Sequence, residues 1–493
     1  MRASGILMHI SSLPSDYGIG TMGVEAYKFI DFLKKSKQRY WQILPVCPTS
    51  YGDSPYQSFS TYAGNPYFID FDLLKKEGLL KKSDYSSLDW GENPEYVDYE
   101  KIYNNRYKVL KKAYKRFSKG DKSDFYKFLD ENERWISNYA LFMSIKGEND
   151  GKCWLLWEDS LKHRDPHALW QFKETHLEEI EFWEFVQYKF FEQWQALKEY
   201  AKENNIGIIG DIPIYVALDS ADVWVSPDLF ELDEELLPTS VAGCPPDAFS
   251  ADGQLWGNPI YQWDRHKETG YAWWIDRMSI AMKLYDLVRI DHFRGFDEFY
   301  SIPYGDETAR NGEWVKGPGI ELFKVLEEKL GKLPIIAEDL GYLTPTVKEL
   351  LKESGFPGMK VLEFAFYPDS DSDYLPHNFT KNSVAYIGTH DNAPLKEWLA
   401  ETDKKTVKFL REYINFTGNG DSEFIWAVTK VLLSSVADTA IMQMQDILEL
   451  GSEARMNIPS TPYGNWQWRM KKGANTKALE KRLASLTKIY GRS

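Results

Sequence analysis

The sequence predicts an α/β protein built on a closed (β/α)₈ TIM barrel with subdomains inserted around its catalytic mouth. Eight short apolar segments recur along the 493-residue chain, and segments with a helical spacing of apolar residues lie between most of them. Alternating strands and helices favour parallel pairing with right-handed crossovers, and eight such units close a barrel. Several apolar segments end in acidic or other polar residues. Because the active site of such a barrel lies at the carboxyl ends of its strands, these residues are expected to converge on one pocket.

The expected strands are short, apolar and rich in β-branched residues, as buried strands are. They are 5–11, 40–46, 206–214, 288–293, 334–340, 360–366, 384–391 and 440–448. The apolar spacing predicts helices between them, for example over 25–35 after the first strand and over 346–353 after the fifth. The end of the chain, 471–493, is expected to form a basic amphipathic helix that closes the barrel.

Two gaps between strands are too long for simple crossovers. The first follows the second strand and contains helical patterns over 100–117 and 181–204, so residues 75–190 are interpreted as an inserted, mainly helical subdomain. The second gap, 215–263, contains Pro245-Pro246, several glycines and little helical periodicity, which indicates a structured loop subdomain over the active site. The whole chain, 1–493, is otherwise interpreted as one catalytic barrel.

Composition narrows the classes of ligand. Lys and Arg number 59 and Asp and Glu 74, a net charge of −15, so nucleic acid and anionic membranes are poor partners and a neutral ligand fits better. Aromatic residues make up 15% of the chain, which permits stacking on sugars, although large cores also use them. Three isolated cysteines suggest neither a disulfide framework nor a zinc site. With no apolar stretch long enough for a signal core or a membrane span, a cytoplasmic protein is expected.

The stretch 288–296 carries the strongest local indication of chemistry. Side chains alternate faces along a strand, so Arg289 and Asp291 are expected on the same face. A carboxylate at the end of an apolar strand needs a partner, and a guanidinium there favours its ionised form. An ionised, oriented carboxylate is what a glycosyl nucleophile requires. A purely structural Arg–Asp pair is the alternative.

Two further acids end other expected strands, Glu338 on the fifth and Asp391 on the seventh. Chemistry on a glycosidic bond needs two carboxyl groups whose pKa values are held apart, and a third acid can hold sugar hydroxyls. Glu338 could instead cap a helix, and Asp391 could bond its own loop backbone. His390 has no further ligands at metal-binding spacing, so a substrate contact is favoured over a metal site. No phosphate-binding or dinucleotide fingerprint is present, and no cofactor is expected.

With these motifs in place, the sequence closely resembles the 4-alpha-glucanotransferases, also called amylomaltases or disproportionating enzymes, which are relatives of the alpha-amylases. The resemblance extends from Arg2 to about Arg469. Besides the three acid motifs, the matching stretches are 5–14, 52–57, 210–216, 245–250, 253–259, 445–448, 454–457 and 464–466.

The resemblance implies transfer of α-1,4-glucan segments between maltooligosaccharides by a retaining double displacement. It assigns Asp291 as nucleophile, Glu338 as general acid/base and Asp391 as transition-state stabiliser. By the same match, the implied glucan contacts are Ser54, Tyr56, Asp211, Gln254, Trp256, Arg289, His390 and Asn465. Tyr56 and Trp256 could also be core residues.

The residues 242–258 resemble the family's loop that overhangs the cleft. The sequence departs from the family after Asn392, where the family commonly continues Asp-Thr and this chain has Ala393-Pro394. The triad is unaffected, but the contribution of this loop to sugar binding is open. Two alternatives are kept: a hydrolase of the same chemistry, and a non-catalytic glucan-binding barrel.

Overall fold

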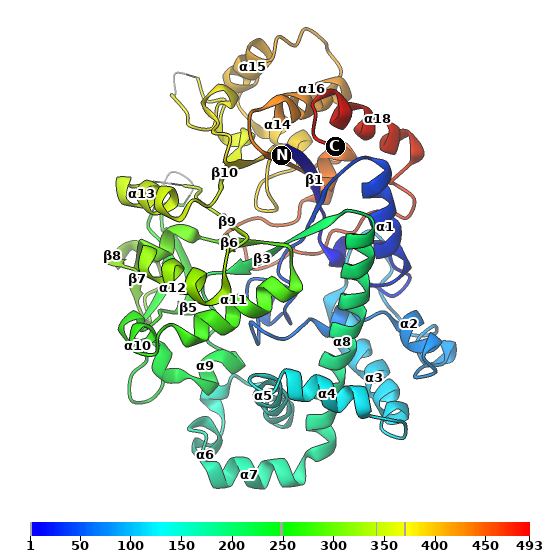
Figure 1. Cartoon of the computed structure of the whole chain (residues 1–493), viewed down its shortest axis with the longest axis vertical. Coiled ribbons are helices and arrows are strands. Elements are labelled where there is room, and N and C mark those ends of the chain that lie inside the picture. The colour runs from blue at the N-terminus through cyan, green and yellow to red at the C-terminus, as the bar shows by residue number, and fades with distance from the viewer. Residues whose placement is uncertain (1, 247–249, 342, 369–370) are drawn as a thin grey trace.

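The computed structural model describes residues 2–246, 250–341, 343–368 and 371–493. Within these residues, eight parallel strands close into a barrel in the order β1-β12-β11-β10-β9-β6-β3-β2 (Figure 1). The strands are β1 Ala3–Leu7, β2 Tyr40–Gln42, β3 Gly207–Pro213, β6 Leu287–Asp291, β9 Ile335–Ala337, β10 Gly358–Val361, β11 Ser383–Tyr386 and β12 Thr439–Gln443. The (β/α)₈ prediction is confirmed. Most strands end before the expected segments do, because those segments continue into the loops at the mouth.

The register between β3 and β6 determines which charged residues lie opposite each other at the mouth of the barrel. Asp211 lies opposite Arg289, and Pro213 lies opposite Asp291. On the other side of β6, Ile290 pairs with Ala337 of β9, so Glu338 follows directly beside the end of β6. Because all these strands are parallel, their carboxyl ends meet at one rim of the barrel.

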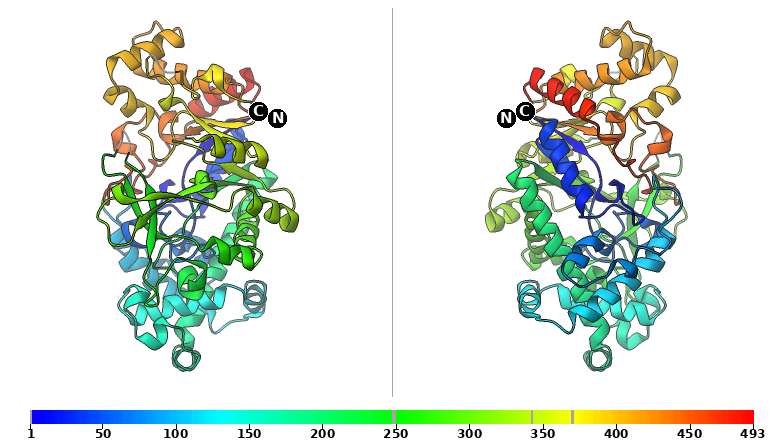
Figure 2. Two further views of the ribbon diagram at one scale, coloured as in Figure 1. Left: turned by 90° about the vertical axis from the view of Figure 1, so that its left-hand side faces the viewer. Right: turned by 90° about the vertical axis from the view of Figure 1, so that its right-hand side faces the viewer.

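Helices surround the strands as the alternating pattern predicts (Figures 1 and 2). They include α1 Val24–Lys35, α8 Leu177–Glu203, α11 Ala272–Leu284, α12 Ile320–Leu330, α13 Pro345–Ser354, α16 Asp421–Ser434 and α18 Lys477–Ile489. The last helix packs on α1 and α16. After it, Arg492 donates to the Ala3 carbonyl of β1 over 3.0 Å, which ties the end of the chain to its beginning.

A helical segment lies between β2 and β3, at the lower end of the molecule in Figure 1. It comprises α2 Phe71–Lys76, α3 Tyr99–Phe117, α4 Ser123–Glu131, α5 Ile136–Glu148, α6 Asp159–Lys162 and α7 Pro166–Thr175. The 27-residue α8 connects it to the barrel, since this helix is about 40 Å long and contacts α3, α4 and α5 as well as α1 and β3.

The second long gap contains more regular structure than the sequence indicated. Its strands β4 Ser240–Cys244 and β5 Gln254–Pro259 join β7 Glu298–Pro303 and β8 Glu313–Lys316 in an antiparallel sheet of order β5-β4-β7-β8. Two short helices, α9 Ala221–Val225 and α10 Trp263–Glu268, flank the two new strands. The loop interpretation missed β4 and β5 because β4 pairs with β7, which lies beyond the next barrel strand and is remote in sequence.

The remaining helices follow the later strands. α14 Leu395–Glu401 and α15 Lys404–Tyr413 come after β11, and α17 Met444–Ile447 follows β12. Among the described residues, no helix is both long and apolar enough to cross a membrane.

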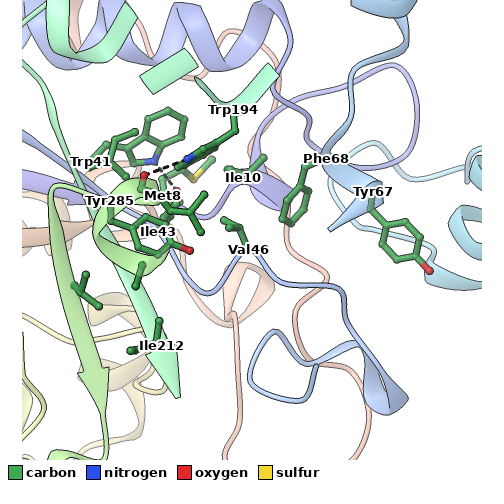
Figure 3. Close-up of a cluster of buried hydrophobic side chains, with 14 of the residues drawn as sticks. Met8, Ile10, Trp41, Ile43, Val46, Tyr67, Phe68, Trp194, Ile212 and Tyr285 are labelled. Carbon is green, nitrogen blue, oxygen red and sulfur yellow. Dashed lines mark hydrogen bonds between the residues drawn. The ribbon is translucent and has the colours of Figure 1, made fainter. Parts of the chain in front are cut away.

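Large aromatic side chains fill the core between the first strands and α8 (Figure 3). The indole of Trp41 donates to the Met8 carbonyl over 2.7 Å, and that of Trp194 donates to the Leu284 carbonyl over 3.1 Å. Buried indole N–H groups need such partners. These bonds fix the positions of the two indoles in the core beside the barrel.

Candidate active site

Arg289 lies at the centre of the charged groups in the barrel mouth. Its Nη1 is 2.6 Å from Oδ2 of Asp211, and its Nη2 is 3.0 Å from Oδ1 of Asp291. The first contact follows from the β3–β6 register, and the second joins residues two apart on one face of β6. Arg289 is only 2% exposed, so its contacts with the two carboxylates are shielded from water. Oδ2 of Asp211 also accepts the hydroxyl of Tyr56 over 2.9 Å.

The structure places Asp291 under opposing influences. Burial raises the pKa of Asp291, and the Arg289 guanidinium opposes that rise. The nearby charge of Asp391 adds to the effect of burial. The effect of Arg289 follows from the sequence, whereas the larger opposing effect of burial depends on the fold. About 29% of the Asp291 side-chain surface remains exposed, so the group is accessible from the mouth.

Glu338 follows β9 and is held by backbone amides rather than by a cation. The amide of His292 donates to its Oε2 over 2.6 Å, and the amide of Leu340 donates to its Oε1 over 2.9 Å. Burial raises the pKa of Glu338 to about 8; Arg289 lowers it, and the negative charge of Asp291 raises it further. A carboxyl group with this pKa holds its proton near neutral pH.

Asp391 lies five residues beyond β11 and is held by side chains. Nδ2 of Asn457 donates to its Oδ1 over 2.7 Å, and Nε2 of His390 lies 3.2 Å from its Oδ2. The neighbouring Asn392 satisfies the loop backbone instead, since its Oδ1 accepts the Thr389 amide over 2.8 Å. Among the described residues, the Asp391 carboxylate thus contacts side chains, while Asn392 bonds the loop backbone.

His390 belongs to a cluster of three mutually contacting rings, in which Tyr56 and Trp466 also lie 5.8 Å apart. The ring of Tyr56 stacks on it at 5.2 Å and 11°, and that of Trp466 lies at 5.9 Å. Burial lowers the pKa of His390 to about 4, so the imidazole is neutral at neutral pH. A neutral, fixed imidazole can form directed hydrogen bonds to Asp391 or to a sugar hydroxyl.

The strand β5 brings Gln254 and Trp256 toward the same rim. The Trp256 indole donates to Oε1 of Gln254 over 3.0 Å, and its ring meets the ring of His292 edge-on at 4.8 Å. Gln57 donates to the Asn258 side chain over 3.1 Å, which links the loop after β2 to β5. The half-buried Trp256 is thus positioned beside the loop that follows Asp291.

Two of the expected glucan contacts, Ser54 and Asn465, form hydrogen bonds within their own loops. Oγ of Ser54 accepts the Tyr56 amide over 3.2 Å, which shapes the turn that presents Tyr56. Oδ1 of Asn465 accepts the Ile458 amide over 2.9 Å, and its Nδ2 donates to the Thr461 carbonyl over 2.9 Å. Glucan contacts by these two residues, like those by the other six expected contacts, remain predictions.

Two functional candidates were missed by the sequence reasoning, Asn457 and Trp466. Both belong to stretches already singled out, 454–457 and 464–466, so the signal was present without a role attached. Asn457 is braced in turn, because Nε of Arg455 donates to its carbonyl over 3.2 Å and Nη1 of Arg455 lies 3.1 Å from Glu397. The departure at Ala393-Pro394 leads directly into α14. The described residues contain no group of three or more His, Cys, Asp or Glu side chains arranged to hold a metal ion.

Comparison of the chain with known proteins agrees with this arrangement of acids. Residues 8–476 match the family profile described as 4-alpha-glucanotransferase. The chain belongs to the 4-alpha-glucanotransferase family. A 4-alpha-glucanotransferase from Clostridium butyricum is 51% identical over 98% of this chain and all of that protein. One from Streptococcus pneumoniae is 50% identical over all of this chain and 97% of that protein.

Solved structures agree with the family assignment. An amylomaltase from Streptococcus agalactiae, determined in complex with acarbose, superposes with a TM-score of 0.98 at 46% identity and covers all of both chains. An amylomaltase from Corynebacterium glutamicum has a TM-score of 0.81 at 17% identity, which shows the shared fold.

Proposed function

We propose that the chain carries out the reaction of its family, transfer of α-1,4-glucan segments, by a retaining double displacement through a covalent glucosyl-Asp291 intermediate. The single observation that carries this mechanism is the contrast between two neighbouring acids. The Arg289 guanidinium opposes the burial that raises the pKa of Asp291, whereas Glu338 accepts from two backbone amides and has a pKa raised to about 8. Two carboxyl groups in such different environments suit a nucleophile and an acid.

In the first step, a carboxylate oxygen of Asp291 attacks the anomeric carbon of the donor glucan. The bond from that carbon to the glycosidic oxygen breaks, and Glu338 gives its proton to the departing oxygen. In the second step, the 4-hydroxyl of an acceptor glucan attacks the same carbon and releases Asp291, while Glu338 takes the hydroxyl proton. The two inversions leave the anomeric configuration unchanged.

The other residues bind and orient. Asp391, fixed by Asn457 and His390, is assigned to stabilise positive charge near the ring and to hold sugar hydroxyls. Arg289 bridges Asp211 and Asp291 and so orients both carboxylates. We also propose the inserted segments 75–190 and 215–263 as subdomains around the mouth.

Transfer rather than hydrolysis requires that an acceptor sugar intercept the intermediate before water does. Binding energy achieves this by holding an acceptor hydroxyl in a near-attack position and by excluding water. Tyr56 and Trp256 offer aromatic surfaces that can cover glucose rings. Acarbose bound to the Streptococcus agalactiae amylomaltase supports maltooligosaccharides as ligands here.

Incubation with maltotriose tests the proposal. Glucose and a ladder of longer maltooligosaccharides are expected, with total reducing ends nearly constant. Reducing ends that rise in step with substrate loss, without longer chains, would establish the hydrolase alternative. An Asp291→Asn variant should bind glucan without turnover; unchanged turnover in this variant would exclude Asp291 as nucleophile.

A further inference from the structure

A cleft of about 520 Å³ lies between the helical insert and the outer helix α11 of the barrel. The segment from α4 to α5 forms one wall, and α9 and α11 form the other. In Figure 1, α4, α5 and α9 lie in the lower half of the molecule, below α11. The volume falls within the range of pockets that hold small organic ligands, about 300–1,000 Å³. None of its lining residues belongs to the candidate active site.

Packed aromatic side chains separate this cleft from the catalytic acids. Trp273 lines the cleft, and its ring contacts that of Tyr261 at 5.7 Å. The Tyr261 ring contacts Tyr215 at 6.0 Å, and Tyr215 contacts Trp256 at 6.2 Å. Both tyrosines are buried, at 1% and 4% exposure. A ligand in the cleft is therefore held apart from the reacting groups.

Three aromatic rings meet in the cleft. The rings of Tyr62 and Trp135 stack at 6.3 Å and 25°, and Tyr62 meets Trp273 at 6.3 Å and 71°. Tyr62 and Trp273 remain half-buried, so they keep ring surface that a ligand can cover. Two rings set at a steep angle form an apolar corner, which suits the C–H face of a sugar ring.

The polar lining disfavours an anion and offers hydrogen-bond acceptors to a molecule rich in hydroxyl groups. Carboxylates outnumber cations, with Asp130, Glu131, Glu133, Asp222 and Asp276 against Arg134 and Lys283. Arg134 already lies 2.5 Å from Asp276 across the cleft. An anion would meet net negative charge, whereas hydroxyl groups can donate to carboxylate and amide oxygens.

We propose that this cleft binds a short neutral oligosaccharide at a site distinct from the active site. Its identification as an α-1,4-glucan segment rests on the proposed function. A long glucan held here has its remaining length confined near the mouth, which raises its effective concentration there. A trisaccharide is too short to span both sites, so the cleft does not raise its effective concentration at the mouth.

Calorimetric titration with maltotetraose in the non-turnover background Asp291→Asn tests the site. Ser279 lines the cleft on α11, and Ser279→Trp should fill it. The matched control is Ala272→Trp, an exposed position on the same helix outside the cleft. Asp291→Asn alone and with the control should show two binding sites per chain, and Ser279→Trp should reduce them to one. Equal stoichiometry in the two double variants overturns the proposal.

The companion assay uses the active enzyme. Ser279→Trp should leave kcat/KM for maltotriose unchanged and lower kcat/KM for long amylose several-fold. Equal losses on both substrates also overturn the proposal, as does binding of spermidine in the cleft under conditions in which maltotetraose does not bind there. If Ser279→Trp does not fold, Ser226→Trp, at the end of α9 on the same wall, replaces it. Absence of the maltotriose ladder in wild-type protein would refute the proposed function alone, because the stoichiometry is measured without turnover.

Discussion

The backbone amide of His292 donates to Oε2 of Glu338 over 2.6 Å, so the residue that follows Asp291 also holds Glu338. His292 has a φ of 53°, a left-handed conformation that is uncommon for a residue with a side chain. The Glu338 amide in turn donates to the Ile290 carbonyl over 3.1 Å. The relative position of the two acids is thus set by the backbones of β6 and β9, and not only by flexible side-chain torsions.

The first prediction concerns the acid. Glu338→Gln should lower kcat/KM for maltotriose by about 10²–10⁴, the usual contribution of a general acid. A maltosyl fluoride should lose much less in the first step, because fluoride departs with little protonation. Steady-state and burst kinetics on both substrates make the comparison. Equal losses on the two donors would exclude Glu338 as the acid.

The second prediction concerns the pH dependence of turnover. Glu338 must be protonated to act, and burial raises its pKa to about 8. The kcat/KM for maltotriose should therefore fall as pH rises through about 8. The decrease at alkaline pH should be smaller for formation of the intermediate from maltosyl fluoride. An identical alkaline decrease for both donors would show that a group other than Glu338 causes it.

The third prediction concerns stability. A raised carboxyl pKa means that the folded protein binds the Glu338 proton more tightly than the unfolded chain does. Its stabilising contribution is complete at low pH and is lost as pH rises from about 4.5 to about 8. Glu338→Gln removes this dependence, so the variant should gain Tm relative to wild type at pH 8 and gain less at pH 5. Thermal unfolding at the two pH values measures the difference, and an equal shift at both would contradict the linkage.

The barrel was predictable because its strands are continuous apolar segments whose partners repeat in a regular order. The Arg289–Asp291 contact was predictable for a local reason, since residues two apart share a strand face. The pair Arg289–Asp211 was not, because it depends on the register between β3 and β6. The strands β4 and β5 escaped notice for a related reason: they pair with each other and, through β4, with the remote β7.

The asparagines Asn457 and Asn465 have different contacts that residue type alone does not predict. Asn457 and Asn465 both lie in matching stretches near the end of the chain, and either could serve the site. In the structure, Asn465 bonds Ile458 and Thr461 within its own loop, whereas Asn457 donates to Asp391. Residue type could not have distinguished them.

The fourth prediction follows from this difference. Asn457→Ala removes a donor to the Asp391 carboxylate, and hydrogen bonds to charged groups contribute about 1.5–3 kcal/mol. If the bond is stronger in the transition state, kcat/KM should fall about 10–100-fold. The control is Asn465→Ala, which should lower Tm through its loop with a smaller effect on kcat. A larger kcat loss in Asn465→Ala would show that Asn465 is the more important of the two residues for turnover.

The last prediction concerns the competition between sugar and water. Trp256 lies edge-on to His292 beside Asp291, so its ring can cover an acceptor glucose while the intermediate waits. Trp256→Ala should raise the hydrolysed share of maltotriose several-fold, measured as reducing ends formed per glycosidic bond cleaved. Leu255 is 41% exposed on the alternate face of β5, and Leu255→Ala is the matched control.

Shortening the loop around 248–253 should act in the same direction as Trp256→Ala; its residues 248 and 249 lie outside the described part of the chain. Removal of this loop should admit water to the mouth without changing either acid, so total bond cleavage should persist while longer products decline. The idea fails if Trp256→Ala and the shortened loop slow transfer and hydrolysis in equal proportion, because the segment would then serve donor binding alone.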